Sequence, residues 1–314
     1  MTDKSSKQKD KKKKHSQKCQ RTYAINMPEM HWGGLSENWL QKEFGDMHWA
    51  LIAKGLGVKS DELVDAKGER LYASFVRLRW EASESLYNFK ENQKIKLTSK
   101  LSRYGGKMFF SNVRIKHKHQ AIRAKLMSVF STRNGRDNQS LKKGTPLVAE
   151  APKIPRLKKL PDFANEYMKI KLSLNTPTEK QTEIKLGGVT FHPSTTVLFT
   201  KDYLIEPYDD VNGVGLLYFA SYAKISDKCE RQFFHQLLGE NKELDWAENS
   251  ACLARDIFYF GNANPEETLR YELNDYQFLD EKRLKLTSSL YRKGDGELIA
   301  EIFSIKKLQK LIKF

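Results

Sequence analysis

Two glycine-containing turns, each directly before an expected helix, are the places in this sequence best suited to bind a carbonyl group. The first is "HWGGLS", which contains Gly34 and Leu35, and the second is "NGVGLL", which begins at Asn212. The start of a helix offers backbone N–H groups without helical partners and the positive end of the helix dipole. Aimed at a carbonyl, the N–H groups of Gly34 and Leu35 would stabilise an oxyanion or an enolate, and losing one such donor costs about 3 kcal/mol. Alternatively, the glycines serve only to make a tight turn.

Four polar residues near the first turn are candidates for supporting groups in the same pocket. His31 and Ser36 flank the glycines, while Asn38 and His48 lie further along the expected helix. Three of them have a structural alternative. Ser36 is a good helix N-cap, and Asn38 and His48 can be hydrogen-bonded core groups. No metal or organic cofactor is expected, since the cysteines at 19, 229 and 252 have no zinc-ligand spacing.

The elements that must position these residues are indicated by an internal match. "IKLTSKLSRYGG" (95–106) and "LKLTSSLYRKGD" (284–295) share K-L-T-S-x-L-x-R-x-G at a separation of 189 positions. "GGLSENWL" can be laid on "VGLLYFAS" at a separation of 181 positions. A match over this distance indicates a duplicated domain rather than a short solenoid repeat.

Each half is predicted to hold one long helix and an antiparallel meander. The first helix lies in "GGLSENWLQKEFGDMHWALIAKGLG" and is followed by strands at 70–80, 94–102 and 107–116. In the second half "YMKIKLSLN" and "STTVLFTKDYL" are predicted strands, "LLYFASYAKISDKCERQFFHQLLG" is a helix, and 281–308 form a hairpin. This order predicts an α+β double hot dog, in which a curled sheet wraps each helix. A duplicated α+β fold of another type is left open.

The chain divides into four predicted parts. Residues 1–22 are a disordered basic tail, 23–131 the first hot-dog unit, 132–160 a linker and 161–314 the second unit. The run "KSSKQKDKKKKHSQK" cannot bury apolar surface, which is why a tail is expected there. The linker is rich in Gly, Pro and Lys, and it is long enough to wrap the surface or cover a site.

The net charge of +16 raises the question of an anionic partner. Part of it lies in the tail, and a second share lies in 92–136, which contains no Asp or Glu. A solvated face is the first interpretation, and attraction of a coenzyme A phosphate or an acidic carrier protein is the second. Nucleic acid is not expected, because no recognition motif accompanies the charge. With no signal peptide and no apolar stretch of about 20 residues, a cytoplasmic protein outside the membrane is expected.

Two local strings resemble known families. "YDDVNGVGLLYFASY" (208–222) is similar to the helix-start motif of the acyl-thioesterase hot dogs, but Asn212 stands where that family has its catalytic Asp. An amide can hydrogen-bond a thioester but cannot act as a carboxylate base, so simple hydrolysis is in doubt unless Asp209 or Asp210 takes that place.

The first half resembles a narrower family. "MPEMHWGGLSENWLQKEFGDMHW", followed by "GERLYASFVRLRW", is similar to the bifunctional acyltransferase/decarboxylase of leinamycin-type polyketide biosynthesis, a double hot-dog family. The resemblance implies conversion of methylmalonyl-coenzyme A to a propionyl group on an acyl carrier protein, with Tyr72 as acyl acceptor. On the strand, Tyr72 is expected to face the helix together with Leu78 and Trp80. A core tyrosine without catalytic role is the alternative.

The predicted function is therefore an enzyme that decarboxylates a malonyl- or methylmalonyl-coenzyme A thioester and transfers the acyl group to a carrier protein. A hot-dog thioesterase or dehydratase is the first alternative, and a non-catalytic double hot dog that binds nucleic acid or a protein partner is the second. Acyl-coenzyme A and the carrier protein are the expected partners, and a homodimer is left open.

Overall fold

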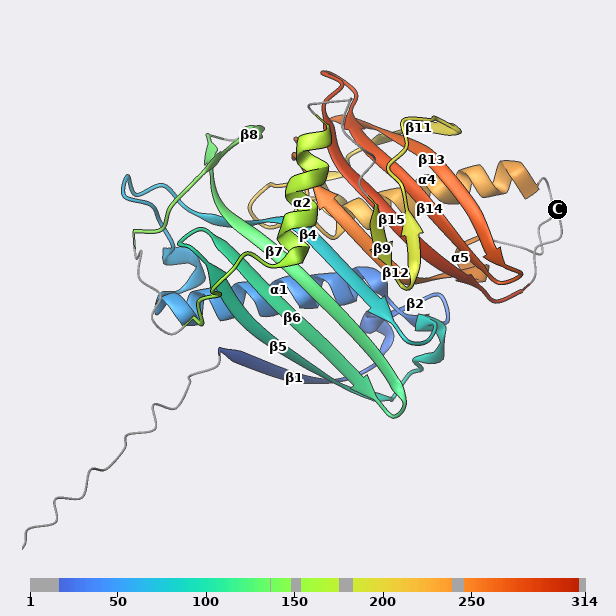
Figure 1. Ribbon diagram of the computed structural model, residues 1–314, viewed down its shortest axis with the longest axis horizontal. Helices are drawn as coiled ribbons and strands as arrows, with labels where there is room; N and C mark the ends of the chain where they lie inside the picture. The colour runs from blue at the N-terminus through green and yellow to red at the C-terminus, as the bar shows by residue number, and fades with distance from the viewer. Residues whose placement is uncertain (1–16, 136, 148–153, 175–182, 239–245, 311–314) are drawn as a thin grey trace, which may run out of the picture.

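A single curved antiparallel sheet of 11 strands runs through the whole molecule (Figure 1). The computed structural model describes residues 17–135, 137–147, 154–174, 183–238 and 246–310. The first half of the sheet has the order β1-β5-β6-β7-β4, with β8 paired to β7, and the second half has the order β12-β15-β14-β13-β11. Its strands are β1 (Lys18–Ala24), β4 (Tyr72–Ala82), β5 (Lys94–Tyr104), β6 (Met108–His117), β7 (Gln120–Asn134), β8 (Asp137–Lys143), β11 (Phe199–Leu204), β12 (Ser250–Tyr259), β13 (Thr268–Asp280), β14 (Arg283–Arg292) and β15 (Leu298–Leu308).

Each half of the sheet holds one long helix on its inner face. Helix α1 (Glu37–Leu56) packs on the first half and α4 (Ser221–Leu238) on the second, and β4 pairs with β12 where the halves meet. This arrangement confirms the predicted α+β double hot dog. The smaller elements are β2 (Met30–His31), β3 (Gly34–Leu35), α2 (Asp162–Ser173), β9 (Ile184–Leu186), β10 (Val189–Phe191), α3 (Pro207–Asp210), α5 (Trp246–Asn249) and the 3-10 turns Met27–Glu29, Ser60–Glu62 and Leu86–Asn88.

Local sequence accounts for the bounds of α1. The Ser36 side chain accepts a hydrogen bond from the Trp39 N–H, and Gly57 ends the helix in the left-handed region at φ 76°. Leu40, Phe44 and Met47 are fully enclosed by the sheet. The helix predicted from apolar spacing is therefore confirmed with both of its ends.

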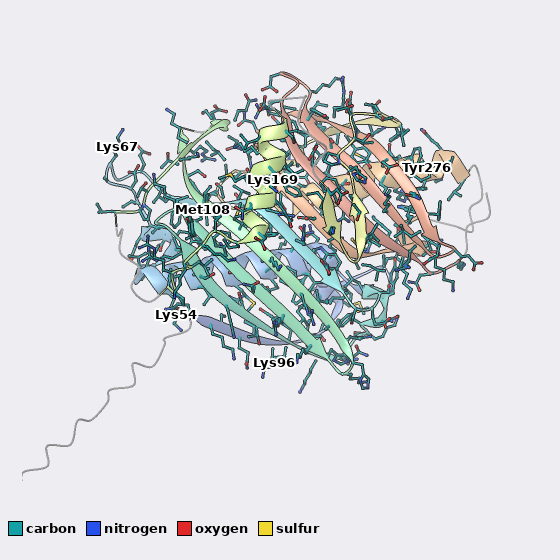
Figure 2. The ribbon with its side chains drawn as sticks, in the orientation of Figure 1. Lys54, Lys67, Lys96, Met108, Lys169 and Tyr276 are labelled. Atoms are coloured by element: carbon teal, nitrogen blue, oxygen red, sulfur yellow. The ribbon has the colours of Figure 1, made fainter. Side chains whose placement is uncertain are left out.

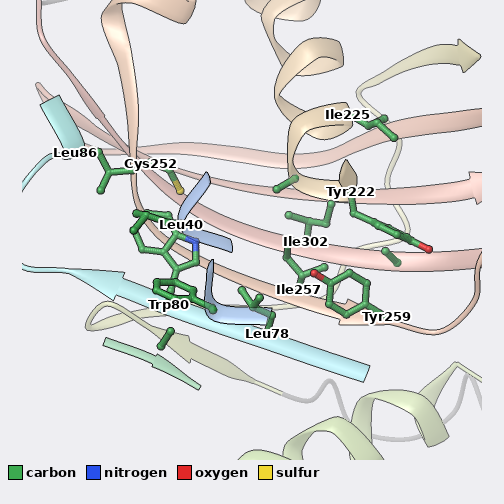
Figure 3. Packing of buried hydrophobic residues seen from close by; sticks show 14 of the residues in the cluster. Leu40, Leu78, Trp80, Leu86, Tyr222, Ile225, Cys252, Ile257, Tyr259 and Ile302 are labelled. Atoms are coloured by element: carbon green, nitrogen blue, oxygen red, sulfur yellow. The ribbon is translucent and has the colours of Figure 1, made fainter. Parts of the chain in front are cut away.

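One apolar core crosses the boundary between the two units. Figure 3 shows Leu40 and Trp80 of the first unit packed close to Cys252 and Ile257 of the second. All four are at most 6% exposed. The units therefore share one apolar core across their boundary.

The duplication is present, but the sequence match at 189 positions pairs the wrong strands. Counted outward from the β4–β12 boundary, β6 corresponds to β14 and β5 to β13. The match instead lays the β5–β6 hairpin on β14–β15, so that each strand is matched with the neighbour of its true counterpart. Both segments carry the alternation of a half-buried strand, with Leu97 and Leu286 facing the core. That alternation is common to amphipathic hairpins whatever their order in the sheet.

Two predicted boundaries are wrong. Residues 18–22, predicted as tail, belong to β1, which pairs with β5 and turns Cys19, Arg21 and Tyr23 inward; residues 1–16 lie outside the described part. The predicted linker also contains structure, since β7 continues to Asn134 and β8 follows it. In both segments the side chains alternate, and each segment lies next to a strand with a free edge for pairing. These two features favour a strand in spite of the high charge of the segments.

The segment "YMKIKLSLN", predicted as a strand, forms the end of α2 as far as it is described. Helix α2 lies on the outer face of the sheet, with Ala164 and Ile170 buried beside the β9–β10 hairpin. Beneath it, the Arg77 guanidinium lies between the rings of Phe163 and Phe258 and binds Asp256 through Nε at 2.9 Å. A short apolar run fits either period, and here the helix buries its apolar side over the boundary between the units.

Candidate active site

The most concentrated charged cluster inside the fold lies where α1 begins. Glu37, the first residue of α1, accepts from Arg255 Nε at 2.6 Å and from Arg255 Nη2 at 3.0 Å. The same Nη2 donates to Asp227 Oδ1 of α4 at 2.8 Å. Two carboxylates from the two central helices therefore share one guanidinium nitrogen on β12.

The cluster continues into the second unit. Lys306 of β15 donates to Asp227 Oδ1 at 2.6 Å and pairs with Glu230 Oε1 at 2.9 Å. Glu230 also accepts from the indole N–H of Trp246 at 2.7 Å. Burial raises the pKa of Glu230, which favours its protonated form. Burial alone would lower the pKa of Lys306, but the charges of Asp227 and Glu230 outweigh burial and raise it.

Asp227 differs from the rest of the cluster because solvent reaches it. Its side chain is 38% exposed, while those of Arg255 and Lys306 are 0% and 4% exposed. Burial raises the pKa of Asp227, but the charges of Arg255 and Lys306 outweigh burial and bring it to about 2. Both cations bind Oδ1, and within the described residues Oδ2 accepts no hydrogen bond. The carboxylate is thus fixed at one oxygen and open at the other.

The starts of α1 and α4 lie side by side at this cluster. The Asn38 side chain donates to the carbonyl of Ala220, directly before α4, at 3.2 Å. A Cβ at Gly45 would lie 2.4 Å from the Phe219 ring, so glycine is needed at this helix crossing. The first turn of α1 therefore contacts the residue before α4, and Arg255 links Asp227, the seventh residue of α4, to Glu37 at the start of α1.

The predicted donors at Gly34 and Leu35 are part of a small hairpin. Strands β2 and β3 pair His31 with Gly34 and Met30 with Leu35, and the Ser36 N–H binds the Glu29 carbonyl at 2.8 Å. By antiparallel alternation the Gly34 N–H belongs to a hydrogen-bonded pair, whereas that of Leu35 does not. A Cβ at Gly34 would lie 2.6 Å from the Leu86 carbonyl oxygen, so close packing explains this glycine. An oxyanion role for these residues stays a prediction.

The four supporting residues are not brought together in one pocket. His31 is exposed and Ser36 caps α1, as described above. His48 is fully buried, with Nδ1 2.7 Å from Ser111 Oγ and Nε2 2.7 Å from Ser128 Oγ. Burial lowers the pKa of His48 to about 3, so the ring is neutral. Ser36 and Asn38 flank Glu37 of the charged cluster, and neither side chain has a hydrogen bond to that cluster within the described residues.

Tyr72 lies on the face of the sheet opposite to the one predicted. A bulge between Phe75 and Arg77 changes the alternation of β4, so that Phe75 and Leu78 both face α1. Tyr72 therefore points outward, and its ring lies 5.5 Å from the Arg70 guanidinium. Trp80, at the other end of β4, is the residue that reaches Glu37, at 3.1 Å. The predicted orientation is wrong, and the catalytic role stays a prediction without support from this geometry.

Asn212 shapes the loop before α4. Its Oδ1 accepts from the N–H groups of Val214 at 3.1 Å and Leu216 at 3.0 Å, which closes a tight turn. Helix α4 consequently begins only at Ser221, later than predicted. Nearby Asp210 is buried, accepts from Tyr203 Oη at 2.9 Å and pairs with Lys224 at 2.7 Å. These contacts explain both residues structurally, and thioester binding by Asn212 stays a prediction.

The residues of the charged cluster were missed because none of them is unusual at its position in the sequence. An acidic residue such as Glu37 is common in the first turn of a helix, and Asp227 lies in a segment of α4 that contains many polar residues. A signal was available at Arg255 and Lys306, which interrupt the apolar runs "CLARDIFYF" and "AEIFSIKKL". A charge within a strand that is buried on both faces needs a buried partner.

Comparisons with known proteins support the fold. No protein-family model matches the chain, and no curated protein matches it. Among solved structures, a protein of Lactobacillus plantarum assigned as an oleoyl thioesterase has a TM-score of 0.65 at 10% identity, covering 95% of this chain and 98% of that one. An acyl-ACP thioesterase of Bacteroides thetaiotaomicron has a TM-score of 0.59 at 12% identity, with 93% and 98% covered. The 12:0-ACP thioesterase of Umbellularia californica has a TM-score of 0.58 at 11% identity, with 94% and 95% covered.

These likenesses extend over nearly the whole of each chain, so the double hot-dog arrangement of both units is shared. At such low identity they show the fold alone. Among the described residues, none of the helices has the length and apolar character needed to cross a membrane.

Proposed function

We propose that the protein is an acyl-thioester enzyme and that its reaction is hydrolysis, with Asp227 as the catalytic carboxylate. The observation that carries the proposal is the position of Asp227, with Oδ1 held by Arg255 and Lys306 and Oδ2 open on a side chain that is 38% exposed. A carboxylate fixed in this way, and linked through Arg255 to the first residue of α1, is suited to attack on a thioester carbonyl. The fold shared with structures assigned as thioesterases agrees with this choice.

The role of Asp227 follows from its charge state. With a pKa of about 2 it is ionised throughout the physiological range and is a weak proton acceptor. It is therefore suited to orient a water molecule at the carbonyl, or to attack the carbonyl itself. In either route the carbon–sulfur bond breaks, the thiolate leaves and takes up a proton, and water supplies the oxygen of the free acid.

Charge balance favours hydrolysis of an uncharged acyl group over decarboxylation of a malonyl group. Three carboxyl groups, Glu37, Asp227 and Glu230, face two cations, Arg255 and Lys306. Each cation is already paired with carboxyl groups of the cluster, and Arg255 Nη1 donates to Ser304 Oγ at 3.1 Å. A malonyl carboxylate entering here would find no unpaired cation in the cluster, which is unfavourable in a partly buried site.

The test compares Asp227→Asn with a matched substitution, Asp280→Asn, at an exposed aspartate of β13. Purified protein is given saturated acyl-coenzyme A of increasing chain length, and thiol release is measured. We expect hydrolysis by the wild type and by Asp280→Asn, and a loss in kcat of about 100-fold or more in Asp227→Asn. Thermal unfolding identifies any loss caused by unfolding, because a broken buried pair costs about 3–5 kcal/mol. A folded Asp227→Asn protein with unchanged kcat would reject the assignment.

Decarboxylation with acyl transfer is the second candidate, favoured by the string from Met27 to Trp49. It predicts release of carbon dioxide from methylmalonyl-coenzyme A and a propionyl group on an acyl carrier protein. The same preparation decides between the two reactions by mass analysis of its products. Free acid without a loaded carrier protein supports hydrolysis, and a loaded carrier protein supports transfer.

A further inference from the structure

We propose that the outer face of the first unit's sheet binds an anionic lipid surface. This face is the side of β1, β5, β6 and β7 that points away from α1, and we call it the basic face. Its cationic side chains are all exposed and project from alternate positions of neighbouring strands. They are Lys18, Lys94, Lys96, Lys100, Arg114, Lys116, Arg123 and Lys125.

The strand registers place these charges in a two-dimensional array. Lys18 pairs with Lys100, which lies in the same row as Lys125, and Arg114 pairs with Arg123 in the next row. Neighbouring strands are about 4.8 Å apart and alternate residues about 7 Å apart, so the array extends roughly 15 Å across the strands and roughly 20 Å along them. Figure 2 shows Lys96 on this sheet with neither α2 nor the β9–β10 hairpin over it.

The array carries no compensating acid along its central strands. The sequence has no Asp or Glu from Asn92 to Arg136, which covers β5, β6 and β7. Within the described residues the eight cations form no ion pair. Like charges held this close together repel one another, and a surface of opposite charge relieves that repulsion.

Two exposed apolar side chains lie in the segment that joins β1 to α1, at the Lys94 end of β5. Trp32 is 58% exposed and Met27 is 65% exposed. The turn that holds Trp32 is joined to the sheet by a bond from Lys90 Nζ to the Gly33 carbonyl at 3.0 Å. Met27 follows Ile25, whose N–H binds the Gln93 carbonyl at 2.8 Å, one residue before Lys94. An exposed indole at the same end of the sheet as Lys94 fits the headgroup layer, where aromatic rings and cationic side chains both gather.

The shape of the charge distribution favours a lipid surface over nucleic acid. The sheet curls around α1, so its outer face is convex (Figure 1). A nucleic-acid duplex is itself convex and would touch one line of such a face, whereas a deformable layer of anionic headgroups can meet the whole array. Each cation near such a layer contributes about 1 kcal/mol. The exposed Trp32 and Met27 add apolar surface that duplex phosphates would not use.

The test is sedimentation of the full-length protein with vesicles of phosphatidylcholine that contain about 30% phosphatidylserine, at about 0.1 M salt. The face variant combines Lys96→Glu, Lys100→Glu, Arg114→Glu and Lys116→Glu. The control variant has the same change in charge at exposed lysines of α2 and the second unit, Lys169→Glu, Lys171→Glu, Lys201→Glu and Lys282→Glu. We expect binding to weaken at least about tenfold in the face variant and less than about threefold in the control.

Trp32 provides an independent readout. Iodide quenching of its fluorescence should fall when vesicles are added, and the change should vanish in Trp32→Phe. Equal vesicle binding by the face and control variants would overturn the proposal, as would equal binding of the wild type to vesicles of phosphatidylcholine alone. Tighter binding to duplex RNA than to the vesicles, lost in the face variant, would assign the face to nucleic acid instead. Substitution of the lysines at 11–14 by Gln measures how much of the vesicle binding comes from the basic N-terminal run.

Discussion

The outer faces of the two units have opposite character, although both belong to one sheet. The outer face of the second unit, together with Phe110 and Met127 of the first, is apolar and carries α2 and the β9–β10 hairpin, with Phe258 and Phe303 fully buried beneath them. The outer face of the first unit carries exposed lysines and arginines. The inner faces are alike because each must enclose a helix. The outer faces are free of that constraint, so specific functions are expected to differ there.

The inner faces differ in a second way, in how each handles buried polar groups. Helix α1 buries a neutral His48 between two serines, whereas α4 presents Asp227 and Glu230 to Arg255 and Lys306. A neutral hydrogen-bonded group stabilises without need of a charged partner, while paired charges are retained at a cost in desolvation. This contrast agrees with the proposed catalytic role of Asp227, in the second unit's half of the core.

The largest expected effect comes from His48. Its pKa lies near 3 in the folded protein and at 6.5 in the unfolded chain. The unfolded chain therefore binds more protons below pH 6.5, and the folded protein loses stability as the pH falls. The full contribution is about 5 kcal/mol, and roughly 3 kcal/mol of it should be lost between pH 6.5 and about pH 4. Urea unfolding at both pH values measures this loss.

The matched variant for this prediction is His48→Asn, which removes the titrating ring. Its free energy of unfolding should fall less than that of the wild type over the same pH interval. If both proteins lose stability equally, His48 is not the buried neutral group that distinguishes α1 from α4.

The next effect has the opposite sign and belongs to the second unit's outer face. Glu301 of β15 is 7% exposed, its Oε2 accepts no hydrogen bond in the described part of the chain, and burial raises its pKa to about 7. The folded protein binds more protons than the unfolded chain above pH 4.5, so stability is lost as the pH rises toward 7. The loss reaches about 3 kcal/mol above pH 7.

Glu301→Gln should therefore be more stable than the wild type at about pH 8, and this advantage should shrink toward about pH 5. Thermal unfolding at the two pH values provides the measurement. A matched control is Glu272→Gln on β13, whose side chain is only partly buried. An advantage of equal size at both pH values would show that folding does not raise the pKa of Glu301.

The smallest expected effect is that of Tyr72→Phe. Since Tyr72 faces outward on β4, away from α1 and from Asp227, the loss of its hydroxyl should change kcat for any thioester by less than about twofold. The assay is the one used for Asp227→Asn. A loss of acyl transfer in Tyr72→Phe would restore its predicted role as acyl acceptor and would place chemistry in the first unit.

The sequence carried most of the fold. Apolar spacing with Ser36 and Gly57 predicted α1, and alternation predicted β5, β6, β14 and β15. Those signals are local, because capping and periodicity depend on neighbours along the chain. The same reasoning failed in α2, where a strand was predicted, because its apolar run is short and a run of a few apolar residues fits a helix or a strand.

The site was largely beyond reach of the sequence. Gly34, Ser36 and Asn212 were singled out by their types, and local packing explains each of them. The cluster of Asp227 with Arg255 and Lys306 joins residues far apart in the chain. The sequence does not indicate that these residues contact one another, and only that contact singles them out.

The amino-acid order by itself determined two wrapped helices, the caps of the first and a surplus of positive charge. Tertiary structure decided which strands correspond, which way Tyr72 points, which carboxylate stays open to solvent and which face collects the lysines. The reason is physical: helix and strand periods are set by backbone geometry, whereas a one-residue bulge or the approach of a distant chain reverses a face or pairs a charge. Such events depend on packing across the whole molecule.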